Sequence, residues 1–426
     1  MNSLTSERHK NDIEIMAPVG SYESLMAAIK TGAKSVYFGV EKLNMRARSS
    51  VNFTLDDLRQ IVEICNQHKV KSYLTANTII FDDELEEIKK ILRAAKQAGV
   101  SATIASDFGV IHYARSIGLN VHISTQVNVT NIESLKFYAT FADVVVLARE
   151  MNLTQVRKIY EQIQTKQIKG PSGKLVRIEM FVHGALCMAV SGKCYLSLHE
   201  KNHSANKGSC LQMCRRSYIV SDKENGQELE IDNEYIMSPK DLKTIHFLNK
   251  LIDAGVSILK IEGRARSPEY VKTVVSCYSE AVDSIFDDSF TKMKISDWDT
   301  RLKRVFNRGF WDGYYLGQQL GEWSSEYGSQ ATTTKKYIAK GTNYFPNIGV
   351  AEFLIEADSL SVDDEIIITG PTTGVIETKV EEIRVNLKSV HIANKGERCS
   401  IAVAQKVRRS DKLYKIIQSK TPIKIL

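Results

Sequence analysis

Residues 1–321 alternate short apolar, β-rich runs with stretches of helical periodicity. Residues 55–70 and 83–99 place apolar side chains at i, i+3, i+4 and i+7, which is typical of a helix with one buried face. The intervening apolar runs predict eight strands, at residues 13–19, 35–40, 71–77, 101–106, 121–127, 144–149, 177–183 and 257–263.

Eight β-then-α units in succession predict an α/β fold of the TIM type, a (β/α)₈ barrel, because parallel strands need helical crossovers and a closed sheet has no edges. An open, doubly wound sheet is the alternative. Polar side chains that collect just after the predicted strands favour the barrel, since that fold gathers its strand ends at one mouth. They are Asn44, Arg46, Arg48, Asn77, Gln126, Asn128, Arg149, Glu150, Glu179, His183, Glu262 and Arg264.

The pattern changes after residue 321. Residues 322–345 lack periodicity and are interpreted as a linker, whereas residues 346–426 contain short β-rich runs between turn signals, which predicts a small β-barrel domain. From residue 331 onward there are 15 Lys and Arg against 11 Asp and Glu, so this part carries +4 of the net +7. A mildly basic domain suits RNA binding. The alternative is an ordinary solvated surface, which can carry the same excess of positive charge.

Composition indicates a globular protein of 426 residues with 43% hydrophobic residues. The first twelve residues are polar, and no apolar run approaches the roughly 18 residues that a membrane span requires. We therefore expect a cytoplasmic protein with no membrane association. Thiols stay reduced in that compartment, where clustered cysteines bind metals more often than they form disulfides.

Four of the seven cysteines fall between residues 187 and 214, with the spacing C-x6-C-x15-C-x3-C. Cys187, Cys194, Cys210 and Cys214 supply the four soft ligands that complete a zinc shell or hold the corners of an iron–sulfur cluster. Structural zinc sites usually use two short knuckles, so the wide first gap favours the bulkier cluster, with zinc as the alternative. Glycines at 184, 192 and 208 let the backbone curl closely around such a centre.

With these residues in view, the chain resembles a collagenase-like family of peptidases of unassigned catalytic type. The family signature E-x-F-x-x-G-[AS]-x-C-x4-G-x-C-x-x-S is matched by Glu179, Phe181, Gly184, Ala185, Cys187, Gly192, Cys194 and Ser197. Residues 17–39, 44–53, 124–131, 147–150 and 260–271 are similar to other family stretches, and the resemblance covers nearly the whole chain.

The resemblance implies an iron–sulfur hydroxylase that works without molecular oxygen. The most similar branch converts the wobble uridine of tRNA to 5-hydroxyuridine and depends on prephenate. Other branches hydroxylate a ribosomal RNA cytidine or a quinone ring. Position by position, the resemblance makes the four clustered cysteines ligands of a 4Fe-4S cluster. It also allows a paralogous family member as a partner.

Roles for the polar residues are hypotheses from their chemistry. Arg46, Arg48, Arg149 and Arg264 can pair with the carboxylates of a prephenate-like donor, because guanidinium groups bind carboxylates bidentately. Glu179, His183 or Glu262 can move a proton. Arg215 and Arg216 are candidate RNA contacts beside the last cysteine.

Two further functions stay open. A peptidase needs a nucleophile with its base or a catalytic zinc, and the chain contains neither a G-x-S-x-G elbow nor an H-E-x-x-H motif. A non-enzymatic RNA-binding protein with a structural metal site would leave the polar strand ends unexplained.

Overall fold

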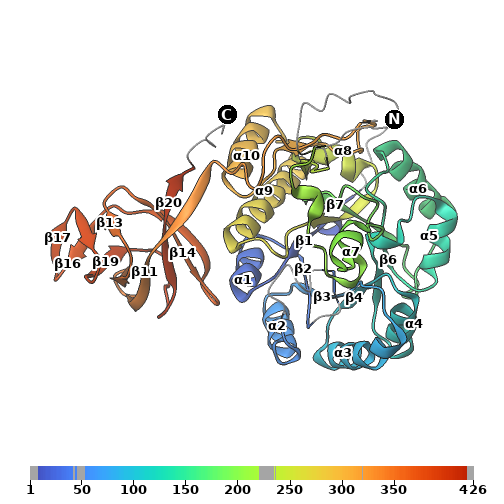
Figure 1. The fold of residues 1–426 in the computed structure, drawn as a ribbon, viewed down its shortest axis with the longest axis horizontal. Coiled ribbons are helices and arrows are strands. Elements are labelled where there is room, and N and C mark those ends of the chain that lie inside the picture. Colours follow the sequence, from blue (N-terminus) through green and yellow to red (C-terminus); the bar gives the residue numbers. More distant parts are fainter. Residues whose placement is uncertain are drawn as a thin grey trace.

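The computed structural model describes residues 8–41, 44–45, 53–219, 235, 237–318 and 320–419 of the chain. Two domains lie side by side in Figure 1: an α/β barrel formed by the first three-quarters of the chain, and an antiparallel β domain.

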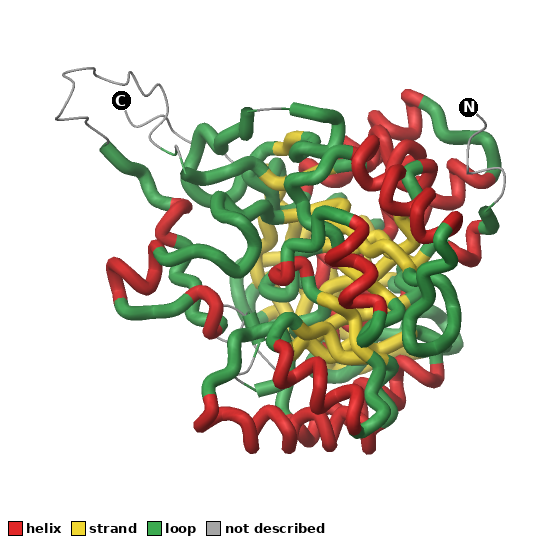
Figure 2. Tube along the Cα trace, turned by 90° about the vertical axis from the view of Figure 1, so that its right-hand side faces the viewer, coloured by secondary structure: helices red, strands yellow, loops and turns green. Residues whose placement is uncertain are grey.

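Eight parallel strands close into a barrel, which confirms the predicted fold and excludes the open sheet. They are β1 (Glu14–Pro18), β2 (Ser35–Phe38), β3 (Lys71–Ala76), β4 (Ala102–Ala105), β5 (Val121–Ile123), β6 (Val144–Val146), β7 (Arg177–Gly184) and β9 (Val256–Ile261). Each pairs with the next, β7 pairs with β9, and β9 pairs with β1. Figure 2 shows the strands enclosed by helices.

The predicted strands differ from the observed ones mainly at their carboxyl ends. The fifth ends at Ile123, and Thr125–Val127 forms a 3₁₀ helix instead. Two short strands were not predicted: β8 (Asp241–Lys243) runs antiparallel to the end of β7, and β10 (Phe310–Trp311) pairs with β8. Such short segments carry no periodic signal.

Helices cover the outside of the barrel, and the two most strongly patterned segments form α2 and α3 as predicted. The helices are α1 (Tyr22–Lys30), α2 (Leu55–Gln67), α3 (Leu85–Ala98), α4 (Phe108–Ser116), α5 (Ile132–Ala139), α6 (Leu153–Thr165), α7 (Leu196–Lys201), α8 (Leu248–Asp253), α9 (Pro268–Phe286) and α10 (Lys292–Arg304). Several begin at capping side chains, such as Thr54 before α2 and Asn152 before α6. The short helix α7 is the exception in position, because it lies in front of the barrel strands in Figure 1.

Strand alternation separates two apolar layers. Leu74 and Ala76 of β3 belong to the large core between strands and helices, whereas Tyr73 points inward. The inward layer contains Met16, Tyr37, Tyr73, Ala102, Ile104, Val144 and Ile258. This layer fills the barrel interior, so any cavity must lie above it.

The opposite end of the barrel interior is closed by a buried carboxylate. Glu14 of β1 is 3% exposed and accepts hydrogen bonds from Lys71 Nζ at 2.9 Å, Tyr73 Oη at 2.8 Å and Arg177 Nη1 at 3.0 Å. Burial by itself would raise the pKa of Glu14, but Arg177 and Lys71 outweigh it and lower the pKa to about 2. The carboxylate therefore ties β1, β3 and β7 together.

The C-terminal domain is an antiparallel sheet in the order β15-β14-β20-β11-β12-β19-β16-β17, with β13 and β18 paired separately. Its strands are β11 (Thr333–Phe345), β12 (Val350–Ile355), β13 (Ser359–Ser361), β14 (Glu365–Gly370), β15 (Gly374–Lys379), β16 (Ile383–Val385), β17 (Lys388–Val390), β18 (Ile392–Asn394), β19 (Arg398–Ala402) and β20 (Lys412–Gln418). The β class was predicted. In the described strands of this domain, β15 and β17 lie at the two ends of the hydrogen-bonded order, so the strands form an open sheet.

The predicted linker at 322–345 is wrong over its second half. Residues 333–345 form β11, which pairs with β20 on one side and β12 on the other. Few of its side chains are buried, Ile338 and Ala339 among them, so the strand shows little hydrophobic alternation. Backbone pairing with two neighbours holds it in place instead.

The sheet packs against helices α1 and α9 of the barrel. Ala27 of α1 contacts Ile367 and Val375 of the sheet. Lys30 Nζ donates to the carbonyl of Thr373 at 2.7 Å, and Lys335 pairs with Glu269 at 2.8 Å. The contact combines a small apolar patch with ion pairs, as interfaces between domains commonly do. Within the described residues, no helix is both long and apolar enough to cross a bilayer.

We predict that Glu14→Gln makes the free energy of unfolding less dependent on pH below about pH 4.5. The pKa of Glu14 is below its unfolded value, so its contribution is present above about pH 4.5 and is lost as the pH falls towards 2. The full contribution is about 3 kcal/mol. Urea unfolding of both proteins from pH 7 to pH 3 measures it: the difference in unfolding free energy should shrink below pH 4.5. A constant difference would contradict this assignment.

Candidate active site at the barrel mouth

The clustered cysteines lie on a segment that leaves β7 at the barrel mouth. Gly184 ends the strand with φ +103°, and a Cβ there would lie 2.7 Å from the carbonyl oxygen of Glu262. Only glycine fits this close approach to the end of β9. Gly192 and Gly208 also have positive φ, as their predicted role requires. We call residues 187–219 the cysteine segment; it contains α7.

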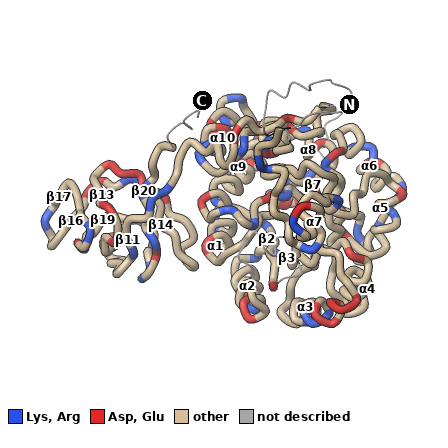
Figure 3. Tube along the Cα trace, in the orientation of Figure 1, with Lys and Arg blue, Asp and Glu red and all other residues tan. Residues whose placement is uncertain are grey.

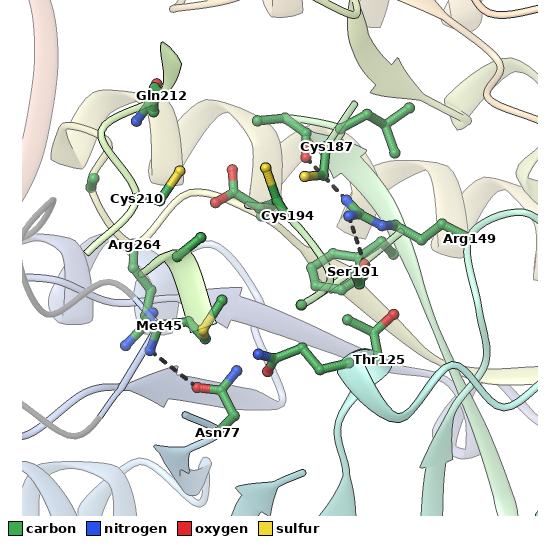
Figure 4. A pocket seen from close by; sticks show the side chains of 18 of the residues that line it. Met45, Asn77, Thr125, Arg149, Cys187, Ser191, Cys194, Cys210, Gln212 and Arg264 are labelled. Carbon is green, nitrogen blue, oxygen red and sulfur yellow. Dashed lines mark hydrogen bonds between the residues drawn. The ribbon is translucent and has the colours of Figure 1, made fainter. Parts of the chain in front are cut away.

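All four clustered cysteines line one cavity of about 260 Å³, together with residues at the carboxyl ends of the barrel strands. Figure 4 labels three of the four, Cys187, Cys194 and Cys210. Cys187 is exposed, and Cys194, Cys210 and Cys214 are partly buried. Burial raises the pKa of Cys214 to about 11, and the other three thiols add to the rise while Arg215 opposes it. Cys187, Cys194 and Cys210 are thus close enough to Cys214 to influence it.

The four thiols are the donor set that an iron–sulfur cluster or a zinc ion would use. Among the described residues, no three His, Cys, Asp or Glu side chains are gathered closely enough to hold one metal ion. Four soft donors on one cavity could hold the separate iron atoms at the corners of an iron–sulfur cluster. Cysteine binds metal as the thiolate, so binding of such a group would release thiol protons.

Most charged side chains of the described lining are cations. Arg149, Lys260, Arg264, Arg266, Arg308 and Arg215 all border the cavity. Glu262 is the one carboxylate in the described lining, and no histidine of the described chain lines it. The cavity is therefore an anion-attracting site beside four thiols.

Arg149 and Arg264 are fixed by neighbouring groups. Arg149 donates to Ser191 Oγ at 2.8 Å and to the carbonyl of Ala185 at 3.3 Å, so it braces the cysteine segment (Figure 4). Arg264 is 5% exposed and donates to Asn44 Oδ1 at 2.9 Å and Thr75 Oγ1 at 2.8 Å. Both guanidinium groups are oriented before any ligand arrives.

Glu179 lies beneath the cavity rather than in its lining. It is fully buried, accepts a hydrogen bond from Lys260 Nζ at 2.6 Å and lies 3.5 Å from His122 Nδ1. Burial by itself would raise the pKa of Glu179, but Lys260 and His122 outweigh it and lower the pKa below its usual value. As a buried carboxylate paired with Lys260, it positions that ammonium under the cavity and does not reach a substrate.

The proposed proton transfer by His183 is wrong, because His183 does not face the cavity. The register between β7 and β9 shifts between Phe181 and His183, and this bulge turns the ring towards Tyr278, Tyr270 and Phe310. His183 is 1% exposed, and burial lowers its pKa to about 3. Among the three predicted proton carriers, only Glu262 borders the cavity.

The remaining predicted residues divide between lining and support. Asn77 and Gln126 line the cavity. The side chains of Asn44, Asn128, Glu150 and Arg216 do not. Asn44 holds Arg264, Asn128 Nδ2 donates to the carbonyl of Ser191 at 3.2 Å, and Glu150 is exposed. Arg46 and Arg48 lie outside the described residues.

Arg215 anchors the cysteine segment, and its proposed contact with RNA stays a prediction. Its guanidinium donates to the carbonyl oxygens of Leu186 and Pro239 and to Ser238 Oγ. These bonds hold the end of the cysteine segment against its start. Arg216 is exposed, so its proposed contact with RNA stays a prediction.

Sequence reasoning missed Lys260, Arg266, Arg308 and Tyr37 in the lining. A signal existed for Lys260, which lies two residues before Glu262 on the predicted strand, whereas Arg266 lies in the turn that follows β9. Arg308 follows α10 and reaches the cavity from a distant part of the chain, where no local pattern marks it.

Comparisons with known proteins agree with this architecture. The model of peptidase family U32 matches residues 20–325. A protein named "Collagenase" from Porphyromonas gingivalis (strain ATCC BAA-308 / W83) is 62% identical over 405 residues, or 95% of this chain and 98% of that protein.

Two relatives carry the names of RNA-modifying proteins. "tRNA hydroxylation protein P1" of Bacillus subtilis (strain 168) is 32% identical over 386 residues, which cover 87% of each chain. "23S rRNA 5-hydroxycytidine C2501 synthase" of Escherichia coli (strain K12) is 32% identical over 326 residues, or 75% of this chain and 47% of that protein.

We predict that Glu179→Gln destabilises the barrel by about 3–5 kcal/mol, because it leaves the buried ammonium of Lys260 without its counter-ion. Urea unfolding measures the change. Combining it with Lys260→Met should recover much of the loss, since the unpaired charge is gone. Glu133→Gln, which removes an exposed carboxylate of α5, is the control and should change little. An additive double variant would contradict the pairing.

Proposed function

The chain belongs to peptidase family U32, and within that family we propose that it is an RNA hydroxylase rather than a peptidase. Specifically, it forms 5-hydroxyuridine at the wobble position of tRNA without molecular oxygen. Cys187, Cys194, Cys210 and Cys214 hold a 4Fe-4S cluster, and prephenate is the co-substrate. Relatives named for tRNA and rRNA hydroxylation support an RNA substrate.

One observation carries the proposal: four thiols and six cationic side chains border the same cavity. When bound, the cluster supplies one-electron redox chemistry. The cations suit a small dianion, because guanidinium groups pair with carboxylates through charge-assisted hydrogen bonds. The proposal therefore assigns the redox chemistry of the cluster and the binding of the anionic co-substrate to the same cavity.

In this scheme the chain's own residues bind and orient the substrates and accept a proton. Arg266 stacks on Phe306, with the guanidinium carbon 3.5 Å from the ring centroid, and presents its charge to the cavity. Lys260 adds a cation from below, held by Glu179. Glu262 is the lining carboxylate that can accept the proton leaving C5 of the uridine. A loop nucleotide can reach these groups, since its base is unstacked at low cost.

A peptidase is the second candidate, because relatives at 62% and 55% identity are named "Collagenase". The described cavity lining contains serines and cysteines but no histidine to act as a base for them. The nucleophile–base pair that peptide hydrolysis needs is therefore not formed there. Cleavage of collagen by the purified, metal-free protein would overturn the hydroxylase proposal.

We predict that a strain lacking this gene loses 5-hydroxyuridine and its derivatives from tRNA, measured by mass spectrometry of digested nucleosides. Complementation with the natural gene should restore them, whereas Cys194→Ser should not, because it removes one cluster ligand. Cys65→Ala is the matched control, since Cys65 is buried in α2 away from the cavity. Unchanged wobble nucleosides in a strain without a second family member would contradict the proposal.

Arg266→Gln should separate co-substrate binding from cluster assembly. The variant should keep its iron, while the KM for prephenate rises about tenfold to a hundredfold through loss of a charge-assisted hydrogen bond. Arg264 is less suited to this test, because its hydrogen bonds to Asn44 and Thr75 make it structural as well. Iron analysis and steady-state kinetics under anaerobic conditions give both readings. An unchanged KM would exclude Arg266 from the binding site.

A further inference from the structure

The outer face of the cysteine segment is basic. Residues 187–219 contain Lys193, Lys201, Lys207, Arg215 and Arg216 against a single acid, Glu200. Figure 3 shows basic positions of the segment beside α7, over the barrel. An excess of positive charge around a cavity mouth attracts a polyanion.

Two of these cations are used inside the protein. Lys207 Nζ pairs with Glu84, donates to the carbonyl of Ile79 at 2.9 Å and lies 4.3 Å from the ring centroid of Phe81. Arg215 is bonded to the carbonyls of Leu186 and Pro239. They fix the middle and the end of the segment to the barrel rim, so its outer face has a defined shape.

The other cations point outward. Lys193, Lys201 and Arg216 are exposed. Lys201 lies 3.9 Å from Glu200, and no ion pair joins Lys193 or Arg216 to another residue of the described chain. They are available to charges outside the protein.

The same segment also carries an exposed aromatic ring. Tyr195 is 70% exposed, although the residues on either side of it, Cys194 and Leu196, line the cavity. Met188, at 43% exposure, and Leu211, at 38%, are exposed apolar side chains of the same segment. A ring with one open face beside phosphate-binding cations is the combination that proteins use to bind single-stranded nucleic acids.

We propose that the outer face of the cysteine segment is the RNA-docking surface, with Tyr195 as its stacking platform. The ring stacks on the base next to the target, while Lys193 and Arg216 pair with flanking phosphates. The proposal rests on the proposed RNA-hydroxylase function and assigns it a substrate class: an unpaired loop rather than a duplex. Bases within a duplex stack on one another and have no free face to offer.

Binding of a labelled anticodon stem–loop to the anaerobically purified protein, followed by fluorescence anisotropy, tests the stacking role. Tyr195→Ala should weaken binding about fivefold to a hundredfold, as loss of one base–ring contact does. Tyr195→Phe should bind within about twofold of the natural protein, because it keeps the ring. Phe137→Ala is the matched control: its ring is 53% exposed on α5, at the barrel periphery in Figure 1.

The salt dependence of RNA binding tests the proposed phosphate contacts of Lys193 and Arg216 separately from the stacking by Tyr195. Lys193→Gln combined with Arg216→Gln should reduce the slope of log affinity against log salt by about 1.4, or about 0.7 for each phosphate contact to a single strand. Lys136→Gln, a charge change on α5, should leave the slope unchanged. These side chains are outside the cavity lining, so this variant remains informative if Tyr195→Ala loses iron.

The outcomes separate the two proposals. Equal binding by the natural protein, Tyr195→Ala and the double variant, with equal iron content, overturns the docking surface and leaves the hydroxylase function standing. Equal competition by an unlabelled duplex of the same sequence overturns the preference for an unpaired loop. Failure of the natural, iron-loaded protein to bind the stem–loop overturns both.

Discussion

The pairing of β7 with β9 closes the barrel, and the arrangement of the mouth depends on it. The register shift within that pairing keeps Glu179 and Phe181 facing inward but turns His183 outward. The same strand then ends at Gly184, where contact with the carbonyl of Glu262 directs the chain across the mouth. One strand thus closes the fold, selects the inward side chains and positions the cysteine segment.

Charge is distributed in layers along the barrel axis. Glu14 at the closed end is compensated by Lys71 and Arg177, and Glu179 above it is compensated by Lys260. At the mouth the balance changes, because arginines outnumber the lining carboxylate. Buried charges are tolerated only with partners, and Arg308 is paired with Asp241. The excess of positive charge lies at the open end, where an anionic ligand or a cluster with four thiolates can balance it.

The cysteine segment has two chemically different sides. Its inner side supplies four thiols and its outer side supplies exposed cations and Tyr195. Arg149, Asn128 and Lys207 tie it to three different parts of the barrel rim. A segment with little regular structure can thereby hold a defined shape, since side-chain hydrogen bonds replace the backbone ladder.

The sequence by itself determined the eight strand positions, the α2 and α3 helices, the β class of the C-terminal domain and the clustered cysteines, because these depend on local periodicity and composition. Tertiary structure decided what depends on register and on distant partners. A bulge removed His183 from the site, a buried pair made Glu179 a support for Lys260, and bonds to carbonyls made Arg215 an anchor. β11 was hidden for a similar reason, since its stability comes from two neighbouring strands rather than from its own apolar pattern. Local pattern fixes which elements form, but which side chain reaches a cavity is set by contacts between residues far apart in the chain.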